Sequence, residues 1–168
     1  LAGRELEREM IPLLKDQGIG LLVWSPLAGG FLTGKFTRDN QQAEGRRSSF
    51  DFPPIDKEKA FDIVDAMRKI ADEHGASVPQ VAIAWVLAQP SVTSVIIGAR
   101  NLTQLDDNLG SVDLELSESE LDTLEKVSQL KMEYPAWMGV FPSDRRPGEV
   151  RRFDQAEEET QSSEEDLD

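Results

Sequence analysis

The stretch SVIIGARNLTQLDDN, residues 94–108, combines residue types that suit an anionic ligand. An apolar run ends at Gly98, Arg100 follows, and Asn101 is a favourable N-cap for the amphipathic segment after it. The unpaired N–H groups and positive dipole end of that helix would then lie beside the Arg100 guanidinium, an arrangement that suits a phosphate monoester. The alternative is an ordinary loop arginine in a chain whose net charge is −14.

The helix predicted after Asn101 also carries polar side chains on one face. Gln104, Asp107 and Asn108 are spaced three and four residues apart, so they share that face. A carboxylate and amides one turn beyond Arg100 could hold a ribose or the edge of a base. The alternative is a solvated helix face without a ligand.

A second stretch, VWSPLAGGFLTGKF, residues 23–36, could hold the rest of an extended ligand. A buried strand would deliver Trp24 and Ser25 to its C-terminal end, where parallel α/β folds place their ligands. There the indole can stack on an aromatic ring, and the glycines let backbone N–H groups approach an oxygen-rich group. Lys35 adds a charge that could reach a phosphate. The alternative is that Trp24 belongs to the core and the glycines only turn the chain.

Hydrophobic periodicity and capping residues predict the elements that would position these two stretches. Apolar runs of strand length suit strands buried on both faces. Pro12 should kink or divide the first helix, and capping boxes at Ser77 and Ser117 mark two later helix starts. Because strands alternate with helices, the strands should be parallel with crossover connections. In chain order we expect a helix over 4–17, a strand over 19–24, a loop to about residue 55, helices over 56–75 and 77–90, a strand over 93–99, and helices that begin near residues 101 and 117.

Composition excludes several classes of protein. Among 168 residues there are no cysteines and one histidine, so disulfides are excluded and a metal site is not expected. An excess of 32 acidic over 18 basic residues opposes nucleic-acid binding. No apolar run approaches the ~20 residues that cross a bilayer, and no leader pattern is present, so we expect a cytoplasmic protein without membrane contact. Residues 141–168 should form a disordered acidic tail, since positions 151–168 hold eight acidic residues against two arginines.

The stretches WSPLAGGFLTGK and, later in the chain, IIGARNLTQLDDN resemble the aldo-keto reductase family, in particular the branch that includes potassium-channel β-subunits and bacterial reductases. The resemblance covers residues 1 to about 138. It implies an α/β fold, the (β/α)8 TIM barrel, of which residues 1–140 would be the C-terminal part. This incomplete barrel would hold roughly the last two strands with their helices. The N-terminal part would be required as a partner, because two strands alone do not make a stable sheet.

The resemblance also implies an NADP-dependent oxidoreductase that reduces small-molecule aldehydes or ketones by hydride transfer. Trp24 corresponds to the aromatic residue that stacks on the nicotinamide, Lys35 lies near the pyrophosphate, and Arg100 lies near the adenosine 2′-phosphate. In the loop, either Arg46 or Arg47 falls near a family arginine. The cofactor-binding positions implied in this way are Trp24, Ser25, Pro26, Leu27, Ala28, Gly29, Lys35, Arg46, Gly98, Arg100, Gln104, Asp107 and Asn108.

No catalytic residue is assigned to this chain. In the family the catalytic Asp, Tyr, Lys and His come from earlier strands and loops, and neither His74 nor Tyr134 corresponds to one of them. The chain alone, as a fragment, is therefore expected to be inactive. Trp137 and Met138 could wall the substrate pocket or simply cap the barrel. The alternative function is a non-catalytic, NADP-binding regulatory subunit that resembles a potassium-channel β-subunit.

Overall fold

The computed structural model describes residues 1–40, 47 and 50–134. The chain divides into two units, 1–130 and 131–168, and the helices and strands given below lie in the first. In the second unit, residues 131–134 form no helix or strand. The tail predicted over 141–168, together with Trp137 and Met138, lies outside the described residues. No helix in the described part of the chain has the length and hydropathy needed to cross a bilayer.

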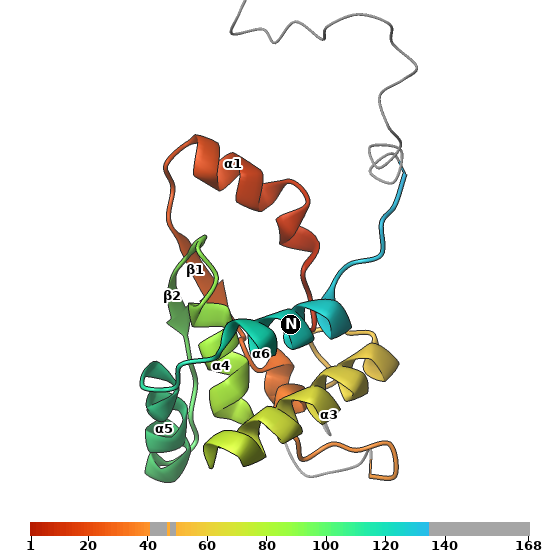
Figure 1. Ribbon diagram of the computed structural model, residues 1–168, viewed down its shortest axis with the longest axis vertical. Helices are drawn as coiled ribbons and strands as arrows, with labels where there is room; N and C mark the ends of the chain where they lie inside the picture. The colour runs from red at the N-terminus through yellow and green to blue at the C-terminus, as the bar shows by residue number, and fades with distance from the viewer. Residues whose placement is uncertain (41–46, 48–49, 135–168) are drawn as a thin grey trace, which may run out of the picture. The chain divides into compact units, whose positions relative to one another are not determined.

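A parallel pair of strands, β1 (Leu21–Trp24) and β2 (Val92–Ile96), forms the sheet in the described residues (Figure 1). The connection between the two strands contains α3 (Lys57–His74) and α4 (Val78–Leu87). The predicted alternation of strands with helices and the parallel pairing are therefore confirmed.

Each strand is covered on one face only. Val23 and Val95 pair with each other and pack against the hydrophobic core, and α4 lies against β2. On the other face the side chains of Leu22, Trp24 and Ile96 are 59%, 57% and 49% exposed. The expectation of strands buried on both faces is wrong for this structure, because the described helices cover one side of the sheet.

The first helical segment is divided, but not at the proline. A single 3-10 turn, η1 (Glu5–Glu7), precedes α1 (Met10–Asp16), and the break falls at Arg8 and Glu9. Pro12 lies in the first turn of α1, where a backbone N–H has no partner within the helix. The proline therefore fits within α1, and the expectation that it breaks the helix is wrong. The observed break lies upstream of it.

The other predicted helix starts are confirmed by their caps. Each N-cap side-chain oxygen accepts a hydrogen bond from the backbone N–H three residues further along the chain. That N–H has no partner within the helix, so the cap satisfies it. Gly75, at φ +61°, ends α3 as predicted. Two 3-10 segments, η2 (Ala28–Thr33) and η3 (Gly110–Val112), had no clear sequence signal. The N-caps are Asp56 for α3, Ser77 for α4, Asn101 for α5 (Leu102–Leu109) and Ser117 for α6 (Glu118–Ser128).

The core of the first unit lies around α3, which packs against α4, α6 and η2, and η2 also packs against α4. These helices are brought together by apolar stripes at helical spacing, as the sequence predicted for α3 and α4. The largest fully buried apolar side chains are Leu32, Ile63, Val64, Met67, Val81, Ile83 and Leu124.

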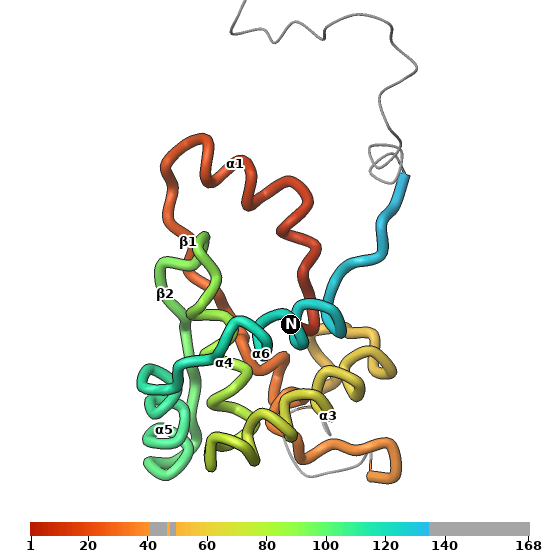
Figure 2. The backbone as a smooth tube through the Cα atoms, in the orientation of Figure 1, coloured from red at the N-terminus to blue at the C-terminus, as the bar shows by residue number. Residues whose placement is uncertain are grey.

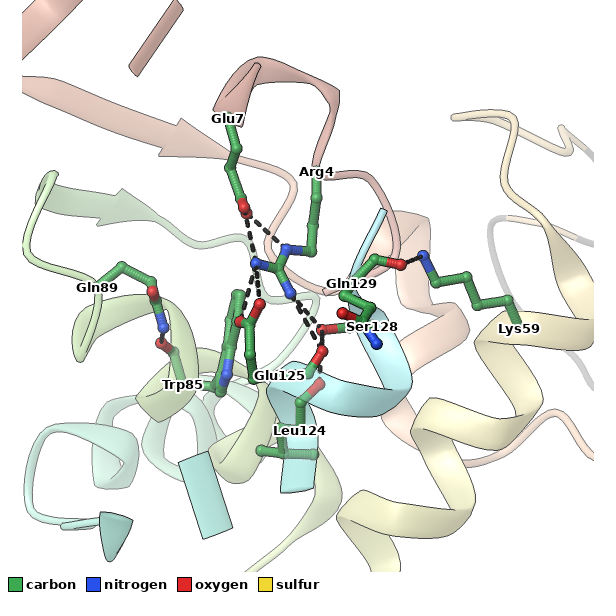
Figure 3. A network of polar contacts seen from close by, with 9 residues as sticks. All are labelled: Arg4, Glu7, Lys59, Trp85, Gln89, Leu124, Glu125, Ser128 and Gln129. Carbon is green, nitrogen blue, oxygen red and sulfur yellow. Dashed lines mark hydrogen bonds and ion pairs between the residues drawn. The ribbon is translucent and has the colours of Figure 1, made fainter. Parts of the chain in front are cut away.

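A polar network ties the start of the first unit to α6, which lies beside it (Figures 2 and 3). The Arg4 guanidinium is almost fully buried; it donates to Glu7 at 2.6 and 2.7 Å, to Glu125 at 2.9 Å and to the Ser128 hydroxyl at 2.9 Å. It also lies 5.3 Å from the centre of the Trp85 ring. Burial disfavours the charge, but the hydrogen bonds to Glu7 and Glu125 raise the pKa of Arg4 above its ordinary value.

Candidate cofactor-binding groove

A groove of about 630 Å³ opens at the C-terminal ends of β1 and β2, beside η2 and the start of α5. Every predicted cofactor-binding residue lines it except Ala28, which is buried, and Arg46, which lies outside the described residues. The two stretches singled out from the sequence thus meet at one place. The lining residues are Trp24, Ser25, Pro26, Leu27, Gly29, Gly30, Thr33, Lys35, Pro79, Ile96, Ile97, Gly98, Ala99, Arg100, Gln104, Asp107 and Asn108.

The turn after β1 is tightly wound. Ser25 and Ala28 have positive φ values of 56° and 49°, which are uncommon for residues other than glycine. The Ala28 N–H donates to the Ser25 carbonyl at 2.9 Å, and the Gly29 N–H donates to the Ser25 hydroxyl at 3.2 Å. A Cβ at Gly29 would clash with the backbone carbonyl oxygen of Phe52, so this position needs glycine. Backbone strain of this kind concentrates at binding sites.

Trp24 is not a core residue. Its side chain is 57% exposed at the end of β1, and its ring centre lies 6.2 Å from that of Phe52 at a tilt of 47°. The alternative that the indole is packed inside the protein is therefore wrong for this structure. The exposed ring is available for stacking on a flat ligand.

Arg47, the other loop arginine considered from the sequence, does not line the groove. Its buried guanidinium donates to the carbonyls of Ala28 at 2.9 Å and Pro53 at 2.8 Å and forms an ion pair with Asp51. It also lies over the ring of Phe31. Arg47 therefore holds the long loop against the turn after β1.

Two cations from different parts of the chain converge in the groove. Burial, and next the charge of Arg100, lower the pKa of Lys35 below its ordinary value. The Arg100 backbone N–H donates to the Gln104 side-chain oxygen at 3.0 Å, and the Gln104 N–H donates to Asn101 at 2.9 Å. These two bonds fix the backbone at the start of α5, while the Arg100 side chain remains exposed.

The polar face predicted for α5 is confirmed to face the groove, because Gln104, Asp107 and Asn108 all line it. The Asn108 side-chain amide donates to the Gly98 carbonyl at 3.4 Å, and Asp107 accepts a hydrogen bond from the Ser77 hydroxyl at 2.9 Å. The groove is thus lined by a carboxylate as well as by two cations.

Some lining residues were not singled out from the sequence. Gly30, Thr33 and Ile97 fall inside the two quoted stretches, so the motifs already marked their neighbourhood. Pro79 comes from the first turn of α4 and had no signal beyond its role at a helix start. A single sequence does not indicate that the start of α4 will lie beside a groove formed by other parts of the chain.

His74 and Tyr134, to which the sequence assigned no catalytic role, are not among the residues that line the groove. The His74 Nε2 atom, at the end of α3, lies 2.6 Å from a carboxylate oxygen of Glu120 on α6, and His74 does not line the groove. Tyr134 belongs to the second unit and is 76% exposed. Within the described ranges, no three His, Cys, Asp or Glu side chains are grouped so that they could hold a metal.

Comparison with known proteins finds a potassium-channel subunit and several reductases among the relatives of this chain. The chain is 36% identical over 140 residues to a "Probable voltage-gated potassium channel subunit beta" of Arabidopsis thaliana, which covers 80% of this chain and 43% of that protein. It is 29% identical over 126 residues to the "NADH-specific methylglyoxal reductase" of Escherichia coli (strain K12), covering 75% and 39%. It is 35% identical over 128 residues to the "Versiconal hemiacetal acetate reductase" of Aspergillus parasiticus, covering 75% and 37%.

The chain spans about two fifths of the length of these relatives. The model of the Aldo/keto reductase family matches residues 3–129, which include both stretches that line the groove. The resemblance seen in the two motifs is thereby confirmed: this chain belongs to the aldo/keto reductase family.

Proposed function

We propose that this chain supplies the cofactor-binding part of an NADP-dependent aldo-keto reductase that reduces an aldehyde or ketone. The observation that carries the proposal is the groove, where an exposed indole, two cations and a helix start meet at the ends of parallel strands. Its volume of about 630 Å³ is within the range of about 300–1,000 Å³ common to small-molecule sites. The cytoplasmic location remains a prediction from the sequence.

Lys35 and Arg100 would bind phosphate oxygens. The lowered pKa of Lys35 reflects burial and repulsion by Arg100, and phosphate groups bound in the groove would offset that repulsion. The N–H groups at the start of α5 add partial positive charge. With Arg100 on the 2′-phosphate, the groove would prefer NADP over NAD. One relative is named for NADH specificity, so this preference is the finer point to test.

Trp24 and the turn after β1 would hold the nicotinamide end. The indole provides a flat surface, and the Ser25 hydroxyl, which accepts from the Gly29 N–H, still has its own proton to donate. Hydride is the chemistry that bound NADPH supplies. The task of these residues is to fix the orientation of the ring, and an oriented ring reacts faster than a mobile one.

The catalytic acid and the remaining strands would come from the N-terminal part of a (β/α)8 barrel. Among the described residues that line the groove there is no Tyr and no His. In the described residues the sheet has two strands, and the apolar side chains of Leu22 and Ile96 on one face of it are exposed. In a closed barrel, side chains of other strands would pack against that face. The relatives, more than twice as long as their matched region, support this proposal.

A second candidate is a non-catalytic, NADP-binding regulatory subunit. The observation in its favour is the similarity to a potassium channel subunit beta of Arabidopsis thaliana, at 36% identity. The two functions share the groove and differ in whether bound NADPH is consumed. A Tyr with its Lys and Asp in the earlier strands would favour the reductase.

The test is a cofactor titration of the complete protein, with the earlier strands present, followed by a single turnover. We expect NADPH to bind about tenfold more tightly than NADH, as one charge-assisted contact provides. Adding an aldehyde to the NADPH complex should then oxidise the cofactor. Binding without oxidation across a panel of carbonyl compounds would favour the regulatory subunit, and failure to bind NADPH would refute both candidates.

A further inference from the structure

Ser77, the N-cap of α4, reaches the groove although it does not line it. Its hydroxyl lies 2.9 Å from Oδ2 of Asp107, thirty residues further along the chain. We propose that Ser77 is a positioning residue for the base of the cofactor: it fixes the Asp107 carboxylate so that the groove prefers adenine over a base with a carbonyl in place of the exocyclic amine. This inference rests on the proposed NADP-binding function.

The hydroxyl of Ser77 has a fixed direction. Its oxygen accepts a hydrogen bond from the Gln80 backbone N–H at 3.3 Å, and the Ser77 N–H donates to the Gln80 side-chain oxygen at 2.9 Å. A hydroxyl has a single proton to donate, and while its oxygen accepts at the helix start, that proton is directed to the carboxylate of Asp107. The capping box therefore serves α4 and also orients a side chain of α5.

The two helices cannot easily separate at this point. The start of α4 lies against the end of α5, because α4 packs against both α5 and the 3-10 turn η3 that follows it. The Gln80 side chain reaches Gly110, which directly follows α5. This packing brings Ser77 within hydrogen-bond distance of Asp107.

The chemistry of the wall follows from this arrangement. An ionised carboxylate can only accept hydrogen bonds. One Asp107 oxygen is used by Ser77, and the residue still lines the groove, so its carboxylate presents an acceptor to a ligand. An exocyclic amine on the base would donate to it, whereas a carbonyl would meet its lone pairs and be repelled. Phosphates would be directed to Lys35 and Arg100 instead.

The experiment compares two cofactors in the complete protein: NADPH, and reduced nicotinamide hypoxanthine dinucleotide phosphate, in which a carbonyl replaces the adenine amine. Ser77→Gly removes the hydroxyl while leaving a residue that is nearly as good an N-cap. Ser77→Thr retains the hydroxyl. Ser117→Gly is the matched control, because Ser117 has the same capping box in α6 and does not line the groove.

We expect the unmodified protein to bind NADPH about tenfold more tightly than the hypoxanthine cofactor, and Ser77→Gly to reduce that preference to about two- or threefold. Ser77→Thr and Ser117→Gly should keep the preference. An unchanged preference in Ser77→Gly, or an equal loss in Ser117→Gly, would overturn the inference and leave the NADP assignment intact. If the unmodified protein does not bind NADPH, the proposed function itself fails.

Discussion

Replacing Arg100 by alanine should weaken NADPH binding far more than NADH binding. The guanidinium is exposed, so water and salt screen part of its attraction for a phosphate, and Lys35 still contributes its charge nearby. A charge-assisted contact is worth about 1.5–3 kcal/mol, and we take the lower end. A loss of about 1.5 kcal/mol corresponds to a Kd roughly tenfold higher for NADPH. For NADH, which lacks the 2′-phosphate, the change should stay within about twofold.

The assay is calorimetric titration of both cofactors at two salt concentrations. Arg38→Ala is the matched control, because it removes the same charge from a side chain that pairs with Asp62 and Asp65 and does not line the groove. Raising the salt concentration should weaken NADPH binding more in the unmodified protein than in Arg100→Ala. Equal losses for NADPH and NADH in Arg100→Ala would show that Arg100 does not bind the 2′-phosphate.

Three further results are expected. Trp24→Ala should slow hydride transfer about tenfold with a smaller loss of cofactor affinity, measured by stopped-flow absorbance; an unchanged rate and affinity would remove the stacking role. Gly29→Ala should lower the free energy of unfolding by about 1–3 kcal/mol more than Gly18→Ala in urea titrations. The two glycines share a φ near +65°, but a Cβ meets the Phe52 carbonyl only at Gly29. Because burial and Arg100 lower the pKa of Lys35, the charged form that binds phosphate is lost at a lower pH than for an ordinary lysine. NADPH affinity should therefore fall as the pH rises through that lowered pKa, and a profile that stays flat up to the ordinary lysine pKa of 10.5 would contradict this.

Features set by neighbouring residues were predicted well from the sequence. The caps at Ser77, Asn101 and Ser117 depend on side chains within three positions, so each helix start could be placed to within a residue. The grouping of Gln104, Asp107 and Asn108 on one face followed from helix geometry alone. The parallel pairing of the strands followed from their alternation with helices, and the two motifs indicated the stretches that meet at the groove.

Features set by distant contacts were missed. Nothing near Arg47 indicates that it bonds to the Ala28 and Pro53 carbonyls, since these are decided by the path of the loop. The same holds for Pro79, which approaches the groove only because α4 packs beside α5. The apolar runs of the strands correctly indicated β-structure, but they could not indicate that one face would be left uncovered by the helices of this chain.

The Arg4 network makes the two ends of the first unit depend on each other. The segment before α1 is joined to α6 by one guanidinium that bonds to Glu125 and Ser128 (Figure 3). Shortening the chain from its C-terminal side past Ser128 would therefore loosen residues more than a hundred positions away. A protease that cuts within α6 would therefore also make the backbone around Arg4 easier to cleave, because Arg4 would lose its partners on α6.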